Sequence, residues 1–395
     1  MRVKSGLDLL STSEVSLDLL GTSVGYLCHS ASVTGDLQFG PTVMQRLLGD
    51  RLKALFGPQH GLVTDVQDNM IETDHYEHPH FKVPVYSLYS DTRAPTLEML
   101  QGLDTFVVDL QDVGTRVYTY IHTLSHVMRV CAEQGVKVVV LDRPNPIGGL
   151  VVEGNVLEPQ YASFVGLHPI AMRHGLTIGE MGLLLHRAFG VGELPQVVAM
   201  QGWSRDMYFS DTGLPWVAPS PNVPSAVSAL PFVGMVLLEG TLLSEGRGTT
   251  QPFEFFGHPK LLQFAWQAEI DAALVGAGVT GYVLRPVQFI PTFQKHAGQV
   301  CGGYQIHVTQ RESFRPWGFA QLVLRELYKH LDEYFEWRSP PYEYETEMLP
   351  IDILNGNNAL RHWVERCGTY EELCELEQAG QAEFQIKREA ALLYS

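Results

Sequence analysis

Hydrophobic stretches in the first half of the chain alternate with segments whose apolar residues recur at helical spacing. Two valine-rich stretches, 105–110 and 136–141, are typical of strands that a parallel sheet buries on both faces. Further strands are expected at 23–28, 52–56 and 83–88, and helices at 41–48, 95–100, 118–133 and 177–188. The alternation predicts an α/β fold in which helices cover both faces of a parallel sheet.

The second half of the chain has a different pattern. Prolines become frequent between 215 and 231, so regular structure cannot continue there, and the segment is expected to cross between domains. Beyond it, helices are expected at 259–273 and 317–334 and strands at 281–289 and 299–308. A capping box at 369–372 opens a helix that runs, with a break, toward the C-terminus. We therefore predict a parallel-sheet domain at 1–230 and a smaller α+β domain at 231–395.

Length and composition support a two-domain globular protein. The chain has 395 residues, 45% of them hydrophobic and 18% charged, and no apolar run reaches the roughly 18–20 residues that span a bilayer. A net charge of −17 argues against nucleic acid and anionic membranes as partners. The N-terminal residues lack a signal-peptide pattern, so a cytoplasmic location is expected. The five widely spaced cysteines are interpreted as reduced and structural.

Polar sequences directly follow three of the expected strands, at 56–61, 109–120 and 142–149. Carboxyl ends of parallel strands share one edge of a sheet, and ligands bind beyond that edge. The side chains expected there are Gln59, His60, Asp109, Gln111, Asp112, Arg116, Tyr118, Tyr120, Asp142, Arg143 and Asn145. The convergence predicts a small-molecule site, and the absence of a Walker loop, a G-x-G-x-x-G and a G-x-S-x-G motif gives no reason to expect a cofactor.

The segment 238–250 is unusually rich in glycines and polar groups. Gly246 and Gly248 flank Arg247, which lets the backbone turn sharply and approach a ligand closely. Glu245 and Thr249 lie beside them, and we interpret the segment as a ligand-binding loop. Other polar blocks contain Glu153, Arg173, His174 and Asn222. The histidines at 75, 78 and 80 alternate along an acidic loop, which is weak support for a metal site, and none is assigned.

Arginines recur in the loops of this acidic chain, whereas Lys137 is the one lysine between 105 and 257. Arginine binds carboxylates and phosphates through two parallel hydrogen bonds, so a small anionic ligand is one interpretation. Surface arginines that pair with surplus carboxylates are the alternative.

Six sequence blocks, taken in order, resemble the exo-β-N-acetylmuramidases, a family of glycoside hydrolases. The blocks are FGPQHG, DLQDVGTRVYTY, LDRPNPIGG, RHGLTIGE, TGLPWVAPSPNVP and EGTLLSEGRGTTQPFE. The resemblance implies a Rossmann-like N-terminal domain, a smaller C-terminal domain and a cleft between them. It implies release of N-acetylmuramic acid from the non-reducing ends of peptidoglycan fragments, with a sugar or muropeptide as substrate. Arg247, supported by Arg143 or Arg116, is expected to bind the lactyl carboxylate.

One departure from the family pattern bears on the catalytic groups. The family motif F-x-P-E-H-G has glutamate where this chain has Gln59, and an amide cannot donate a proton as an acid. Among other carboxylates, Glu245 is expected to be the proton donor, ahead of Asp112 and Glu153. The remaining hypotheses are catalysis assisted by the substrate's acetamido group, another substrate, and a non-catalytic protein that binds amino sugars or anions.

Overall fold

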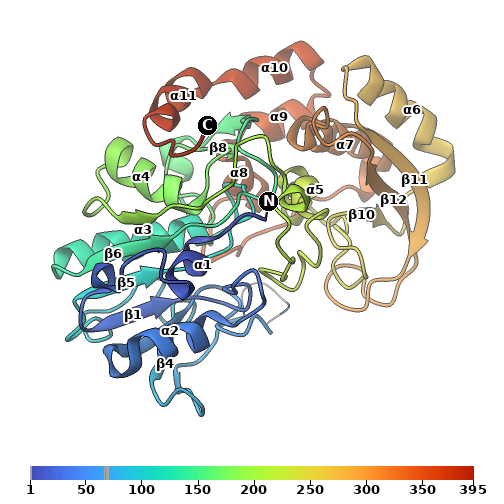
Figure 1. The fold of residues 1–395 in the computed structure, drawn as a ribbon. Helices are drawn as coiled ribbons and strands as arrows, with labels where there is room; N and C mark the ends of the chain where they lie inside the picture. The colour runs from blue at the N-terminus through green and yellow to red at the C-terminus, as the bar shows by residue number, and fades with distance from the viewer. Residues whose placement is uncertain (1, 66, 68–70) are drawn as a thin grey trace.

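The computed structural model describes residues 2–65, 67 and 71–395. A seven-stranded sheet organises the first half of the chain (Figure 1). Its strands are β1 Val24–Leu27, β2 Leu52–Gly57, β3 Tyr76–Glu77, β4 Pro84–Ser87, β5 Thr105–Val108, β6 Lys137–Leu141 and β9 Gln196–Val198. Their spatial order is β3-β4-β2-β1-β5-β6-β9, and β3 is antiparallel to its neighbour whereas the other pairs are parallel. The chain switches direction across the sheet between β1 and β5, which places a ligand crevice at their carboxyl ends.

Helices cover both faces of this sheet, as expected for a doubly wound fold. They are α1 Gly6–Ser11, α2 Gly40–Leu48, α3 Tyr120–Glu133 and α4 Ile178–Phe189. Successive strand residues point to opposite faces, and the two resulting cores differ. Val108 of β5 packs in the core that contains residues of α3 and α4, whereas Val107 packs with residues of α1 and α2. The predicted α/β class and its two helical layers are therefore confirmed.

The second half combines helices with an antiparallel sheet. The helices are α5 Ala229–Met235, α6 Gln263–Gly276, α7 Pro316–Leu331, α8 Pro350–Asn355, α9 Ala359–Glu365, α10 Tyr370–Gln378 and α11 Gln381–Glu389. The sheet has the order β10-β12-β11, with β10 Phe255–His258, β11 Tyr282–Phe289 and β12 Cys301–Val308. A separate antiparallel pair joins β7 Glu153–Val156 to β8 Ala171–Arg173. Short 3-10 helices are η1 Leu17–Leu20, η2 Gly49–Arg51, η3 Pro159–Tyr161, η4 Phe209–Asp211, η5 Val236–Gly240 and η6 Asp332–Tyr334.

Some expected elements differ in the structure. The helix expected at 95–100 is a series of turns, because a single helical turn forms before Gly102 takes a φ of 78°. The helix expected at 259–273 begins at Gln263. The expected break near the C-terminus lies between α10 and α11, where Gly380 has a left-handed conformation. None of the helices in the described ranges combines the length and the apolar content that crossing a membrane requires.

The C-terminal helices return to the first half of the chain. In Figure 1, α11 lies near α4, and α11 contacts both α4 and β7. The last residues, Leu393 to Ser395, bond to Glu180 of α4 and to groups that follow β6 and β9. The boundary at residue 230 stays a prediction.

Candidate active site

A small pocket of about 50 Å³ lies at the carboxyl end of β2 and the N-terminal end of α3. Both halves of the chain contribute side chains to it. Those that could contact a ligand through polar atoms include Gln59, His60, Asn222, Glu239, Arg247 and Glu343. Four of these six, together with Tyr118, were expected from the sequence, so part of the predicted convergence is present here.

Gln59 is held in place by two hydrogen bonds. Its amide nitrogen donates to Oε1 of Glu343 at 3.3 Å, and its amide oxygen accepts from the Thr119 hydroxyl at 2.7 Å. The next residue, His60, has a φ of 71°, which is uncommon for a residue with a Cβ. Such backbone strain costs of order 1–3 kcal/mol and clusters at functional sites. The loop after β2 is therefore built to fix the amide of Gln59 at the pocket.

Glu343 is a buried carboxyl group that lines the same pocket. The Tyr89 hydroxyl donates to its Oε2 at 2.8 Å, while Oε1 accepts from Gln59. Burial raises the pKa of Glu343 to about 7, although the hydrogen bonds from Tyr89 and Gln59 act in the opposite direction. The group can therefore carry a proton near neutral pH.

Glu239 is the second carboxyl group of the pocket, and its surroundings are different. Nη2 of Arg247 lies 2.6 Å from its Oε1, and the Tyr342 hydroxyl donates to its Oε2 at 2.8 Å. Burial raises the pKa of Glu239, but the charge and hydrogen bond of Arg247 outweigh burial and hold the pKa below its ordinary value. Glu239 is therefore ionised where Glu343 can be protonated. Two carboxyl groups whose pKa values are pushed apart form the arrangement that acid-assisted bond cleavage needs.

Arg247 offers the pocket a free donor. Its Nη1 is buried and has no hydrogen-bond partner among the described residues, while Nη2 bonds to Glu239. A buried donor without a partner is costly, so a ligand acceptor at this position would be strongly favoured.

Glu245, the proton donor expected from the sequence, is not among the residues that line this pocket. Its Oε2 lies 2.8 Å from Nζ of Lys295, and its Oε1 lies 3.3 Å from Nε of Arg247. The buried carboxylate of Glu245 thus lies between two cationic side chains, and its contact with Nε helps to orient Arg247. Thr249 also has a hydrogen-bond partner within its own loop, because its hydroxyl donates to the carbonyl of Gly246.

Asp109 and Arg143 form a closed pair outside the pocket lining. Arg143 donates to both carboxylate oxygens of Asp109, at 2.5 and 3.0 Å, and the Tyr26 hydroxyl adds a third bond at 2.5 Å. Gln111 donates its amide hydrogens to backbone carbonyls of Asp112 and Pro144. These strand-end residues satisfy one another, which explains their polarity without a ligand.

Arg116 and Arg173 are also buried away from the pocket lining. Arg116 donates to four backbone carbonyls, of residues 155, 170, 354 and 355, and burial lowers its pKa to about 9. Arg173 donates to the carbonyl of Ile147 at 2.5 Å. Asp112 accepts from the amide of Gly114 and lies 3.3 Å from the ring of His174. Arg116 or Arg143 was expected to support Arg247 in binding the lactyl carboxylate. Neither lines the pocket, and both bond to other groups instead.

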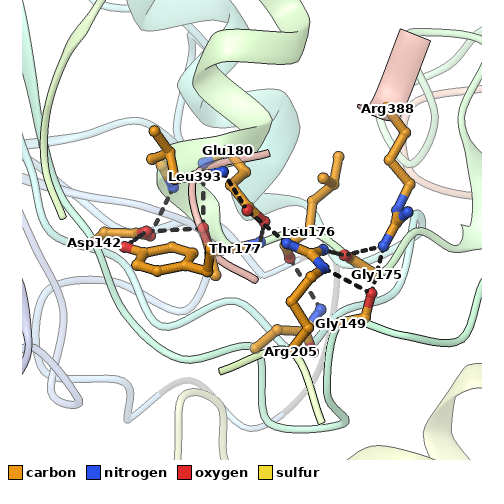
Figure 2. Close-up of polar contacts among 12 residues, drawn as sticks. Asp142, Gly149, Gly175, Leu176, Thr177, Glu180, Arg205, Arg388 and Leu393 are labelled. Atoms are coloured by element: carbon orange, nitrogen blue, oxygen red, sulfur yellow. Dashed lines mark hydrogen bonds and ion pairs between the residues drawn. The ribbon is translucent and has the colours of Figure 1, made fainter. Parts of the chain in front are cut away.

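Asp142 lies in a second buried polar network, shown in Figure 2. It accepts hydrogen bonds from the Thr177 hydroxyl, the Gly179 amide and the Tyr394 hydroxyl. Burial raises its pKa to about 6 against these bonds. Beside it, Glu180 pairs with Arg205 at 2.6 Å and accepts from the Leu393 amide. The network fastens the C-terminus to the ends of the strands.

The remaining expected residues have structural partners as well. Asn145 donates to the carbonyl of Leu176, and the Tyr120 hydroxyl donates to the carbonyl of Pro219. Glu153 accepts from the first amides of α7, those of Trp317 and Gly318, and burial raises its pKa to about 7. Among the histidines of the acidic loop, His75 accepts from the backbone of Ser87. Over the described ranges, no group of three side chains has metal-binding geometry.

Sequence analysis missed two carboxyl groups of the pocket. Glu239 opens the last of the six blocks, so its place in that block was an available signal. Glu343 lies in the acidic stretch YEYETE, where local sequence gives no sign that one of three glutamates is buried. Tyr89, which bonds to Glu343, is 254 residues away from it in the chain.

Comparison with known proteins identifies the family of the chain. Residues 24–227 match the family model of the N-terminal domain of the exo-β-N-acetylmuramidase NamZ, and residues 230–394 match that of its C-terminal domain. The chain belongs to the NamZ family. It is 38% identical to the peptidoglycan β-N-acetylmuramidase NamZ of Bacillus subtilis strain 168, over 100% of this chain and 92% of that protein.

Solved structures of the DUF1343 family share the NamZ-family fold of this chain. One protein from Bacteroides fragilis NCTC 9343 superposes with a TM-score of 0.86 at 29% identity, and another with 0.74 at 24%. Each alignment covers 100% of this chain and 99% of the other. The expected Rossmann-like sheet and smaller second domain are thus shared with experimental structures.

Proposed function

We propose that this protein is a glycoside hydrolase that releases N-acetylmuramic acid from the non-reducing ends of peptidoglycan fragments. One observation carries the proposal: the pocket contains a protonatable carboxyl group, an ionised carboxylate and an arginine with an unused donor. Hydrolysis of a glycosidic bond requires the first two, and the lactyl carboxylate of the sugar suits the third. The Bacillus relative, which matches over 92% of its length, is named a peptidoglycan β-N-acetylmuramidase.

The sugar would enter with its lactyl carboxylate toward Nη1 of Arg247. Ligand sites usually enclose roughly 300–1,000 Å³, and this pocket encloses about 50 Å³. The ring would therefore fill this pocket and extend beyond it, toward the loops around it. Two such loops, 219–224 and 241–253, are rich in glycine, proline and polar residues.

The alternative of a non-catalytic sugar-binding protein depended on Gln59. Because Glu343 lies within hydrogen-bond distance of that amide, a carboxyl group is still available where the family motif has its glutamate. We therefore favour hydrolysis. The cytoplasmic location expected from the sequence stays a prediction.

The decisive experiment uses two aryl glycosides and one disaccharide. Wild-type protein should release 4-nitrophenol from the β-glycoside of N-acetylmuramic acid and leave the N-acetylglucosamine glycoside nearly untouched. It should also release free N-acetylmuramic acid from a disaccharide in which that sugar is linked β-1,4 to N-acetylglucosamine. Equal rates on the two aryl glycosides would refute the assigned substrate, and binding without turnover would favour the sugar-binding alternative.

A further inference from the structure

The contacts around Glu343 separate it from three buried carboxylates that have cationic partners. Asp109 is held by Arg143, Glu180 by Arg205, and Glu245 by Lys295 and Arg247. Glu343 instead contacts two neutral groups, the amide of Gln59 and the hydroxyl of Tyr89. A carboxyl group without a cationic partner, at the wall of a pocket, is the one that can hold a proton and give it away.

The two carboxyl groups of the pocket differ in their neighbours. Tyr342 donates to Glu239, while the next residue in the chain, Glu343, accepts from Gln59 and Tyr89. Glu239 is thus grouped with Arg247, and Glu343 with neutral donors. Because all three side chains line the same pocket, a sugar held by Arg247 would lie close to both carboxyl groups.

We infer that Glu343 is the proton donor of this enzyme, and that Gln59 and Tyr89 are positioning residues that hold its carboxyl group toward the glycosidic oxygen. This inference rests on the proposed function. The proton of Glu343 passes to the glycosidic oxygen as the bond from C1 breaks, and the bonding electron pair leaves with that oxygen. Ionised Glu239 stabilises the positive charge that develops on the sugar. Water then supplies the hydroxyl group of the released sugar, and its remaining proton restores the acid.

Gln59 acquires a specific role in this arrangement. The Thr119 hydroxyl occupies its oxygen, which turns the amide N–H toward Glu343. Tyr89 is likewise fixed, since its ring packs against Phe164 and Tyr344 and lies under the guanidinium of Arg93. Both donors thus approach Glu343 from rigid supports, which keeps the acid in one orientation.

The test uses substrates that need protonation to different extents. A nitrophenol leaves readily without an acid, whereas a sugar hydroxyl does not. In Glu343→Gln, kcat/KM on the disaccharide should fall at least ~100-fold, and on the aryl glycoside less than ~10-fold. The wild-type alkaline limb, which should begin near pH 7 because Glu343 loses its proton there, should be absent from the variant's profile. Equal losses on both substrates, or an unchanged limb, would overturn the assignment.

Two further variants protect this test from folding artefacts. Glu377→Gln neutralises another carboxyl group whose pKa burial raises, and it lies outside this pocket, so both rates should match wild type. Tyr89→Phe keeps the acid but removes one donor to its ionised form, so the alkaline limb should move to higher pH. An unmoved limb would refute the positioning role of Tyr89. If wild type hydrolyses neither substrate, the proposed function falls and the inference falls with it.

Discussion

The pocket and the network around Asp142 come from similar sequence but differ in how their polar atoms are used. Both follow buried strands, and both contain an arginine beside acidic residues. In the network of Figure 2, Asp142 accepts from Thr177, Gly179 and Tyr394, and Arg205 is shared between Glu180 and backbone carbonyls. In the pocket, Nη1 of Arg247 has no hydrogen-bond partner among the described residues, and Glu343 accepts from the neutral groups of Gln59 and Tyr89.

This difference teaches how to distinguish binding residues from structural ones. Polar groups that satisfy each other raise no demand for a ligand, however dense they are in sequence. Groups that remain partly unsatisfied at a cavity gain from a ligand, because it replaces contacts that folding has left unmade. The comparison therefore predicts losses of turnover on one side and losses of stability on the other.

The largest effect should come from Glu239, one of the two glutamates that contact Arg247. Glu239→Gln should reduce turnover on both aryl glycoside and disaccharide by about 100- to 10,000-fold, because an ionised carboxylate is lost from the pocket. Glu245→Gln, which sequence alone made the catalytic variant, should mainly lower the melting temperature. Steady-state kinetics beside thermal melting measure both. A larger turnover loss in Glu245→Gln would instead support Glu245 as the proton donor.

The next largest effect should be a loss of stability when the Asp109–Arg143 ion pair, which lies outside the pocket, is broken. Arg143→Met leaves Asp109 buried without its cation, which should destabilise the fold by about 3–5 kcal/mol. Urea unfolding measures the change, and turnover per folded molecule should stay near the wild-type value. Selective loss of affinity for N-acetylmuramic acid in a stably folded variant would show that Arg143 binds the sugar after all.

Selectivity for the lactyl group should depend on the arginine of the pocket. Arg247→Lys keeps the charge beside Glu239 but removes the planar donor Nη1. Affinity for N-acetylmuramic acid should fall by about 1.5–3 kcal/mol, the worth of a charge-assisted hydrogen bond, while affinity for N-acetylglucosamine changes little. Titration calorimetry with the two sugars gives the comparison directly. Equal weakening of both would remove Arg247 from lactyl recognition.

Sequence predicted the sheet better than the site for a physical reason. Strands such as β5 and β6 can be predicted because their sequences are local apolar runs. The strands β7 and β8, with Glu153 and Arg173 at their paired ends, lack such runs. Local density of polar residues singled out Arg247, which lines the pocket, but it could not tell Asp142, which is internally bonded, from a ligand contact. Glu343 depends on Gln59 and Tyr89, and such distant pairings are set by the tertiary fold.

The substitution Gln59→Glu should have a moderate effect on turnover, and the effect should depend on pH. Sequence alone favours a gain of hydrolysis in Gln59→Glu. In the structure, however, a carboxylate there would face Oε1 of Glu343, now 3.3 Å from the amide nitrogen, and two such groups share a proton. We expect turnover at pH 7 to fall several-fold, and the alkaline limb to move to higher pH. Initial rates across pH decide the matter, and a faster variant at every pH would support the earlier hypothesis that Gln59 impairs the enzyme.

The smallest effect concerns Glu153, a structural carboxyl group whose pKa, like that of Glu343, burial raises to about 7. In the unfolded chain this pKa is near 4.5, so the folded protein binds the extra proton. Its stabilising contribution is complete below pH about 4.5 and disappears as pH rises through about 7. In Glu153→Gln the contribution is absent, so the melting temperature of wild type minus that of the variant should decrease between pH 5 and 8. A pH-independent difference would show that Glu153 is ionised throughout as the cap of α7.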